Sequence, residues 1–414
     1  MIEKKYMNLT KLLRALIFIA LFILYSNNLI YASNAILNKV DKNCLWLKYD
    51  TVKDSSVADT IINFLVDNKI NKVFFETYSN GEILYNQKDE IQLQFSKIDS
   101  MYSVSTSNPA SYFINRIDSI NTIKIYAWMD IYKLWDKNFY PDNKNHFYYK
   151  CPECLESDIN RRSDKLIKLD KIQSLEWEGV FLSPLHPSVN EYLFEIVKEV
   201  LNNYNLDGLL LDHIRYQNYY YGYNEKGLDL FEELHNINPL DLNRGLISKY
   251  FGYSESEVDS IYNLWDDYRE MKITELVKSI KFNIDNDSLD HELLVAVKES
   301  PIDSKSRWYQ NWSYWLENNL VDYVVVKNYN LDFNEFNYNN KILAKTYHDE
   351  YDLNRIIIGF DSYSDNNINL ANKILSLRLQ KFDNISLYYY EPYKKENNWY
   401  IPIYNVINFN IDNE

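Results

Sequence analysis

The sequence predicts an α/β fold, a closed (β/α)8 TIM barrel, and three observations support this prediction. Eight short runs of β-branched, leucine or aromatic residues recur along the chain, and such runs are typical of strands buried on both faces. Segments with apolar residues at helical spacing lie between these runs, and this alternation indicates a parallel sheet. The chain has 414 residues, of which 46% are hydrophobic, and one barrel with insertions can fill that length.

The predicted strands end in polar residues or tyrosines. In chain order the eight runs end at Asp50, Tyr78, Asp130, Asp212, Glu299, Tyr329, Tyr363 and Glu391. Helical patterns are expected between them at residues 57–70, 188–205, 264–284 and 369–382. Ser188 and Glu191 fit a capping box at the start of the second of these helices.

Two long insertions are expected in this barrel. One covers about residues 134–178, after the third strand, and the other covers about residues 217–260, after the fourth. Insertions of this length in a compact domain are usually lids or binding loops, so both are expected to border the substrate site.

The first 32 residues have the features of a secretory signal peptide. A basic segment with Lys4, Lys5, Lys11 and Arg14 precedes an apolar run at residues 15–25, and cleavage fits after Ala32. We therefore expect a secreted or periplasmic protein without membrane contact after cleavage, with an uncleaved anchor as the alternative. The expected parts are a signal peptide (1–32), an N-terminal segment (33–43), the barrel (44–395) and a C-terminal tail that packs on or trails the barrel (396–414).

The composition restricts the possible partners. The net charge of −15 repels phosphate backbones and gives no attraction to an anionic membrane, so no nucleic acid partner is expected. Aromatic residues make up 16% of the chain, including 38 tyrosines. Such rings would stack on the sugars of an oligo- or polysaccharide, although codon bias is the competing explanation. The oligomeric state is not predicted.

The three cysteines give a weak metal signal. Cys151 and Cys154 form a single CxxC, whereas a structural zinc site needs a second pair of ligands, and only His146 lies nearby in sequence. We expect no metal and no cofactor. A local disulfide and two free thiols both remain open for this pair.

Polar residues at the carboxyl ends of the strands are the candidate site, because active sites of such barrels lie at that end. The expected substrate-binding residues are Glu76, Trp128, Asp130, His213, Arg215, Tyr216, Lys327, Asn328, Tyr329 and Asp361. Structural hydrogen bonding is the alternative role for any one of them.

Many carboxylates in this ring suggest glycoside hydrolysis, which needs one ionised and one protonated carboxyl group beside the scissile bond. Asp212 is the expected ionised member, as nucleophile or base, because it follows an apolar strand and Arg215 is close in sequence to hold its pKa down. Glu299 and Glu391 are the expected acids, because both follow apolar or aromatic runs that would desolvate them.

Several segments resemble a known family. DGLLLDHIRYQN at residues 207–218, with LSPLHPSVNEYLFEIVKEVLNNYNL before it, resembles the glycosyl-hydrolase-like family ten of bacterial (β/α)8 barrels. NKVFFETYSNGEILYNQ, IKIYAWMD and VDYVVVKNYN resemble the second, third and sixth strands of that family. The resemblance covers roughly residues 44–393.

The resemblance implies hydrolysis of a bacterial glycan, of cell-wall or exopolysaccharide type, outside the cytoplasm. It places Asp212 on the strand-four aspartate of the family and Glu391 near an acidic position of the eighth strand. It gives Gly208 a structural role, in which the missing side chain lets strand and helix pack closely. Departures at Glu76, Tyr126, His213 and Lys327–Asn328 suggest a changed substrate or lost activity.

A catalytically inactive carbohydrate-binding barrel is therefore the alternative function. In it, the aromatic-rich segments at residues 216–224 and 307–315 would hold sugar rings. A pair of inward carboxylates about 5–9 Å apart would favour catalysis, whereas rim carboxylates all paired to lysine or arginine would favour binding alone. A barrel that binds another protein is a third interpretation, which no motif favours.

Overall fold

A computed structural model of the chain describes residues 42–84, 108–137, 139–169, 177–286, 290–347, 350–388 and 398–408. The predicted signal peptide, residues 33–41 and Glu391 lie outside this part. Within it, no helix combines the length and the apolar character that crossing a membrane requires.

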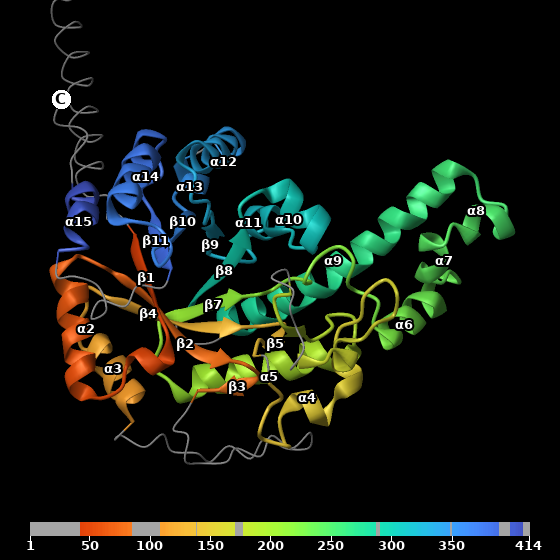
Figure 1. Cartoon of the computed structure of the whole chain (residues 1–414), viewed down its shortest axis with the longest axis horizontal. Helices are drawn as coiled ribbons and strands as arrows, with labels where there is room; N and C mark the ends of the chain where they lie inside the picture. Colours follow the sequence, from red (N-terminus) through yellow and green to blue (C-terminus); the bar gives the residue numbers. More distant parts are fainter. Residues whose placement is uncertain are drawn as a thin grey trace, which may run out of the picture. The chain divides into compact units, whose positions relative to one another are not determined.

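The core of the fold is a closed barrel of eight parallel strands (Figure 1). Each strand pairs in parallel with its neighbours, and β1 closes the barrel by pairing with both β2 and β11. This confirms the predicted fold and all eight predicted strands. The strands are β1 (Asn43–Leu47), β2 (Lys72–Ser79), β4 (Lys124–Asp130), β7 (Gly208–Asp212), β8 (Glu292–Lys298), β9 (Tyr323–Lys327), β10 (Ile356–Asp361) and β11 (Ile385–Tyr388).

Helices surround the barrel because alternate strand residues face outward and need cover. Leu45, Val73 and Leu211 belong to an outer apolar layer that includes helix residues, whereas Trp46, Phe74 and Leu210 form a separate cluster inside the barrel. The helices that follow the barrel strands are α2 (Ser55–Asp67), α3 (Pro109–Asp118), α5 (Pro187–Asn203), α9 (Glu255–Asn286), α10 (Pro301–Trp308), α11 (Trp312–Glu317), α12 (Phe333–Thr346), α13 (Glu350–Leu353) and α14 (Asn367–Leu379).

The predicted capping box at the start of α5 is wrong. His186 is the N-cap, and its Nδ1 accepts a hydrogen bond from the backbone N–H of Ser188 at 3.3 Å. Pro187 occupies the first helical position, where its missing N–H and fixed φ suit the helix, so the helix begins one residue before Ser188.

Both predicted insertions are present and carry their own short elements. The first holds β5 (Lys133–Trp135), α4 (Phe147–Lys150), η2 (Pro152–Cys154), η3 (Asp164–Leu166) and β6 (Val180–Phe181), with β5 and β6 antiparallel. The second holds α6 (Glu225–His235), α7 (Pro239–Asn243) and α8 (Leu246–Phe251), next to the outer end of α9 in Figure 1. Two further elements are η1 (Tyr49–Thr51) and β3 (Glu82–Ile83), which pairs antiparallel with β2.

A charged cluster fills the amino-terminal end of the barrel. The Glu292 carboxylate lies 2.6 Å from Lys72 Nζ, 2.9 Å from Lys124 Nζ and 2.6 Å from the Tyr126 hydroxyl. Burial alone would raise the pKa of Glu292, but Lys72, Tyr126 and Lys124 together outweigh it and the pKa falls to about 2. Tyr126, one of the departures from the family pattern, therefore belongs to this cluster at the amino-terminal end of the barrel, opposite the expected active site.

Gly208 lets two strands approach each other, rather than a strand and a helix as the resemblance implied. A Cβ atom at Gly208 would lie 2.0 Å from the carbonyl oxygen of Glu292, the first residue of β8. Only glycine fits this close contact between β7 and β8.

A last helix, α15 (Ile401–Ile407), packs against α14. Arg378 on α14 donates hydrogen bonds of 2.9 Å to the carbonyl oxygens of Val406 and Ile407. These bonds satisfy carbonyls that the end of α15 would otherwise leave without partners.

Candidate active site

Asp212 is the buried centre of the carboxyl-terminal mouth of the barrel. It ends β7, is 2% exposed, and both of its carboxylate oxygens lie 2.5 Å from Lys327 Nζ at the end of β9. The backbone N–H of His213 donates a further bond of 2.7 Å to Oδ1. Burial alone would raise the pKa of Asp212, but the neighbouring Lys327 charge opposes burial, and the pKa lies below its usual value.

Asp130 and His213 form a second polar pair beside Asp212. Asp130 lies opposite Asp212 in the β4–β7 register, and ligand atoms of Asp130, Asp212 and His213 all lie within 4.8 Å of one another. His213 Nδ1 is 2.8 Å from Asp130 Oδ1. Burial drives the pKa of His213 well below its usual value, so the imidazole is neutral and Nδ1 donates to the carboxylate. The φ angle of His213 is +50°, an uncommon conformation for a residue other than glycine.

These three side chains could in principle hold a metal ion, but a cation already faces Asp212. The Lys327 ammonium contacts both carboxylate oxygens, so the charge that a metal would neutralise is already compensated. The arrangement suits positioning of a carboxylate more than metal binding.

Glu76 is the acidic group with the opposite electrostatic environment. It lies on β2 at a register shift between Glu76 and Tyr78, and its Oε2 accepts a hydrogen bond of 3.1 Å from the backbone N–H of Tyr49. Burial raises the pKa of Glu76, and the neighbouring charge of Asp130 raises it further. The mouth therefore contains one carboxyl group with a lowered pKa, Asp212, and another with a raised pKa, Glu76.

Arg215 does not pair with Asp212, contrary to the sequence expectation. It donates to the Glu178 carboxylate and to the carbonyl oxygens of Tyr216 and Gln217. Lys298 Nζ lies 3.9 Å from the other Glu178 oxygen, and burial lowers the pKa of Lys298 to about 8. Sequence reasoning missed Glu178, because it lies at the end of a long insertion and no motif marks it.

The inner wall of the mouth is aromatic. The Trp46 ring lies 5.0 Å from that of Trp128 and 5.1 Å from that of Tyr388, and Tyr329 stacks on Tyr388 at 5.2 Å. Among the described residues, no hydrogen-bond partner reaches Trp128 Nε1 or the Tyr329 hydroxyl, although both are buried. Buried donors without partners are costly in proteins, so these two atoms are suited to hydrogen bonds with a ligand. Sequence alternation along β1 and β11 could have pointed to Trp46 and Tyr388, which face inward.

The comparison with protein families decides the relationship. Residues 36–374 match the family described as Glycosyl hydrolase-like 10. The chain belongs to the Glycosyl hydrolase-like 10 family. The predicted family is thereby confirmed. No curated protein matches the chain significantly.

Several solved structures are similar to this chain. The glycoside hydrolase domain of PgaB (BpsB) from Bordetella bronchiseptica is 13% identical with a TM-score of 0.60, over 90% of this chain and 100% of that domain. The catalytic domain of β-amylase from Paenibacillus polymyxa is 9% identical with a TM-score of 0.57, over 89% of this chain and 98% of that one. The β-galactosidase from Marinomonas ef1 is 9% identical with a TM-score of 0.51, over 84% of this chain and 54% of that one. At such identities, the likeness shows the fold alone.

Two of the predicted substrate-binding residues of this family member lie away from the mouth surface. Tyr216 is 1% exposed, and its hydroxyl donates to the carbonyl oxygen of Arg269. Asn328 is 2% exposed, and its side-chain amide donates to the carbonyl oxygen of Phe336. Both side chains are buried and bonded to backbone carbonyl groups, which favours a role in packing, so their roles in substrate binding stay predictions.

Three other predicted site residues are Asp361, Glu299 and Glu391. Asp361 ends β10 and accepts hydrogen bonds from the backbone N–H groups of Tyr363 and Ser364, at 3.0 and 3.1 Å. Glu299 is partly exposed and directly follows Lys298, the last residue of β8. Glu391 lies outside the described residues, so its predicted role as an acid stays a prediction.

The two aromatic-rich segments are divided between core and surface. Trp312 and Trp315 are fully buried, so they pack in the core and cannot hold sugar rings. Tyr219 and Tyr220 are 41% and 49% exposed, with ring centroids 4.0 Å apart. Trp308 is partly exposed, and Lys298 Nζ lies 5.0 Å from its ring. Tyr314, at 36% exposure, is a further accessible ring of the second segment, so these four rings are candidates for contact with a carbohydrate.

The cysteine pair forms a disulfide between Cys151 and Cys154. The histidine beside it is His186, not His146. His146 caps α4 through Nδ1, and its Nε2 lies 2.7 Å from the carbonyl oxygen of Asn80. The nearest histidine in sequence is thus used elsewhere, whereas His186 arrives from 32 positions further along the chain.

Proposed function

We propose that this protein is an exported glycoside hydrolase acting on a bacterial glycan of cell-wall or exopolysaccharide type. The observation that carries the proposal is the pair of carboxyl groups in one barrel mouth whose pKa values are shifted in opposite directions. The pKa of Asp212 is lowered, and that of Glu76 is raised. Opposite shifts of this kind separate the ionised from the protonated carboxyl group in glycosidases.

In this proposal Asp212 is the nucleophile or base, and Glu76 is the general acid. β2 and β7 are separated by one strand, β4, so their backbones lie about two strand spacings, roughly 10 Å, apart. We infer that two carboxyl groups that point inward from such strands lie within the separation at which they can flank a glycosidic bond. We therefore prefer Glu76 as the acid to Glu299, which lies one residue beyond the end of β8.

Lys327 and His213 are positioning residues for Asp212. The ammonium and the His213 backbone N–H fix the carboxylate, and the neutral His213 ring holds Asp130 beside it. The fixed carboxylate needs little reorganisation as positive charge develops on the sugar ring in the transition state.

The walls of the mouth support a sugar ligand. The donors Trp128 Nε1 and Tyr329 hydroxyl suit the hydroxyl groups of a sugar, and Trp308, Tyr219 and Tyr220 offer exposed rings for its apolar face. The basic and apolar segments at residues 1–32 support export, which would bring the protein to glycans outside the cytoplasm.

A catalytically inactive carbohydrate-binding barrel is the second candidate, and one observation favours it. Lys327 compensates the charge of both Asp212 oxygens at 2.5 Å, and Glu178 is similarly paired with Arg215. The raised pKa of Glu76 is the observation that favours the hydrolase over this second candidate.

The experiment that separates these functions is incubation of the protein from Ser33 with bacterial glycans, including stripped cell-wall strands. Release of reducing ends is compared for wild type, Asp212→Ala and Glu225→Gln, an exposed carboxylate on α6 that serves as control. We expect release by wild type and Glu225→Gln but not by Asp212→Ala. Release by none, with glycan retained in a pull-down, would replace the hydrolase by the binding barrel, and equal release by all three would remove Asp212 from the mechanism.

A further inference from the structure

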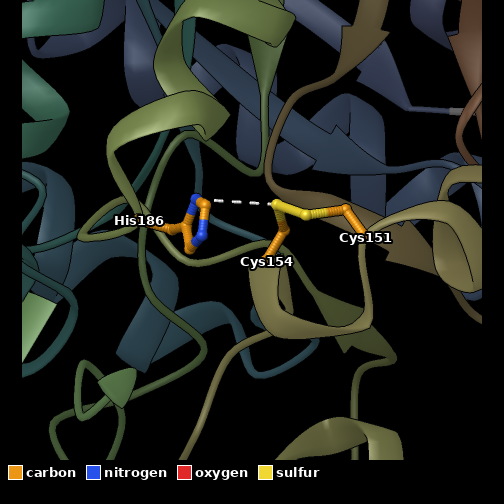
Figure 2. A group of neighbouring side chains, drawn as sticks. All are labelled: Cys151, Cys154 and His186. Atoms are coloured by element: carbon orange, nitrogen blue, oxygen red, sulfur yellow. Dashed lines mark hydrogen bonds between the residues drawn. A yellow bond between two sulfur atoms is a disulfide. The ribbon is translucent and has the colours of Figure 1, made fainter. Parts of the chain in front are cut away.

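A second cluster of reactive side chains lies in the first insertion, apart from the barrel mouth. Figure 2 shows the Cys151–Cys154 disulfide with the His186 ring facing the sulfur of Cys154. His186 Nδ1 lies 3.6 Å from Cys154 Sγ. All three side chains are buried, at 5%, 0% and 8% exposure, and their ligand atoms lie within 4.8 Å of one another.

Backbone contacts hold this cluster together without help from the disulfide. The Asn224 side-chain amide donates to the carbonyl oxygens of Glu153 and Leu155, at 2.7 and 2.9 Å. The backbone N–H of Ser183 donates to the carbonyl oxygen of Cys154 at 2.8 Å, which ties the cysteine loop to the segment that leads to His186. Opening of the disulfide would therefore leave both sulfur atoms beside the imidazole.

Two thiolates and an imidazole are ligands that zinc prefers. Two sulfur atoms on a tetrahedral zinc ion, with bonds of about 2.3 Å, lie about 3.8 Å apart, which rotation of the two side chains can reach. The Cα atoms of the two cysteines are 5.2 Å apart.

We propose that Cys151, Cys154 and His186 form a redox-gated site for a zinc-type divalent cation, closed as the disulfide and opened by a thiol reductant. The proposal is independent of the hydrolase proposal, since it uses none of the residues of the barrel mouth. A dithiol reductant gives two electrons and two protons to the disulfide and becomes a disulfide itself, which leaves two cysteine thiols. Zinc then displaces the two thiol protons to solvent and binds both sulfur atoms, a water molecule and His186 Nδ1, which gives up its hydrogen bond from the Ser188 backbone N–H.

The remaining cysteine does not complicate the test. Cys44 is a buried free thiol in the barrel interior, and burial raises its pKa to about 12. It therefore stays protonated at neutral pH and is a poor metal ligand.

The test is metal binding by the full-length protein before and after reduction with a dithiol, followed by removal of the reductant. Zn2+ binding is measured by competition with a chromophoric chelator, and Co2+ is used as a probe because cobalt–thiolate bonds absorb in the near ultraviolet. We expect one Zn2+ ion per reduced chain, a cobalt–thiolate band, and neither in the disulfide form.

Variants identify the ligands. Cys151→Ser and His186→Asn should each weaken Zn2+ binding at least about tenfold. Loss of a residue that only supports a metal ligand already costs about this much, so loss of a ligand itself should cost no less. Asparagine keeps an acceptor at the N-cap of α5, so His186→Asn should still fold. His146→Asn removes the other buried N-cap histidine of this insertion and should leave the affinity unchanged.

Four results would overturn the proposal. They are a reduced chain that binds no Zn2+, a Co2+ complex without the thiolate band, equal affinity in the ligand variants, and a disulfide that the dithiol cannot open while circular dichroism shows a folded chain.

Discussion

Replacement of Lys327 by methionine should alter both the titration of Asp212 and the stability of the barrel. The ammonium lies 2.5 Å from both oxygens of a carboxylate that is 2% exposed. Methionine keeps the apolar stem, which lies near the rings of Trp46 and Tyr388, but removes the charge. Asp212 would retain the backbone N–H of His213 as a partner.

The magnitude follows from the burial of the ion pair. Removal of one partner of a buried pair typically costs about 3–5 kcal/mol, and the remaining His213 contact places Lys327→Met near 3 kcal/mol. A neighbouring opposite charge usually lowers the pKa of an aspartate by about 1–3 units, so the pKa of Asp212 should rise by that amount in the variant. A carboxylate whose pKa is lowered in the folded state stabilises the fold at every pH above its pKa in the unfolded chain. The variant should therefore lose the most stability, relative to wild type, at neutral pH, and the loss should shrink in acid.

The assay combines urea unfolding at several pH values with the pH dependence of kcat/KM on the identified glycan. The acidic limb of the profile, which reports ionisation of Asp212, should move up by about 1–3 pH units. Lys298→Met is the matched control, because Lys298 faces Lys327 in the strand register and lies near Glu178. An unmoved acidic limb with a stability loss below about 1 kcal/mol, the value of an exposed pair, would refute the reasoning.

Three further predictions concern other residues. Glu76→Gln should lower kcat by about 10²–10⁴-fold. The pH–rate profile of the wild type should have its maximum between the lowered pKa of Asp212 and the raised pKa of Glu76, and initial rates across pH should show that the variant lacks the alkaline limb. Glu292→Gln should lower the free energy of unfolding in urea by about 3 kcal/mol at pH 7, because it leaves Lys72 buried without its anion. This difference from wild type should shrink as the pH falls from 4.5 towards about 2, the pKa of Glu292 in the folded protein. Gly208→Ala should lower the melting temperature and cost at least about 1–3 kcal/mol, since its Cβ would lie 2.0 Å from a carbonyl oxygen of β8. An unchanged pH profile for Glu76→Gln, or an unchanged unfolding curve for Glu292→Gln or Gly208→Ala, would contradict the role given to that residue.

The barrel could be predicted from the sequence because its signals are local. Each strand is a short apolar run between helical patterns, and eight such units in series allow few other arrangements. The position of Asp212 followed from the same signal, because a polar residue after an apolar strand marks the mouth. The capping of α5 was mispredicted because a histidine served as N-cap where serine is the usual choice.

The partners of the site residues could not be predicted, because they come from distant parts of the chain. Lys327 lies 115 positions from Asp212, and only barrel closure brings the two together. Arg215 was assigned to Asp212 because of its nearness in sequence, whereas an insertion supplies Glu178 as its partner. Burial of individual rings was equally hidden, since Trp312 and Trp308 belong to the same aromatic-rich segment but only Trp308 is exposed in part.

The most direct test of the central claim, that Asp212 is the ionised catalytic carboxylate, is a comparison of kcat and Kd for wild type and Asp212→Asn on one glycan. Asparagine keeps the shape of the side chain but cannot be ionised, so it removes the chemistry and leaves sugar contacts in place. We predict a fall in kcat of at least about 10²-fold with a Kd within a few-fold of wild type. An unchanged kcat would contradict the account and leave Asp212 as a structural partner of Lys327.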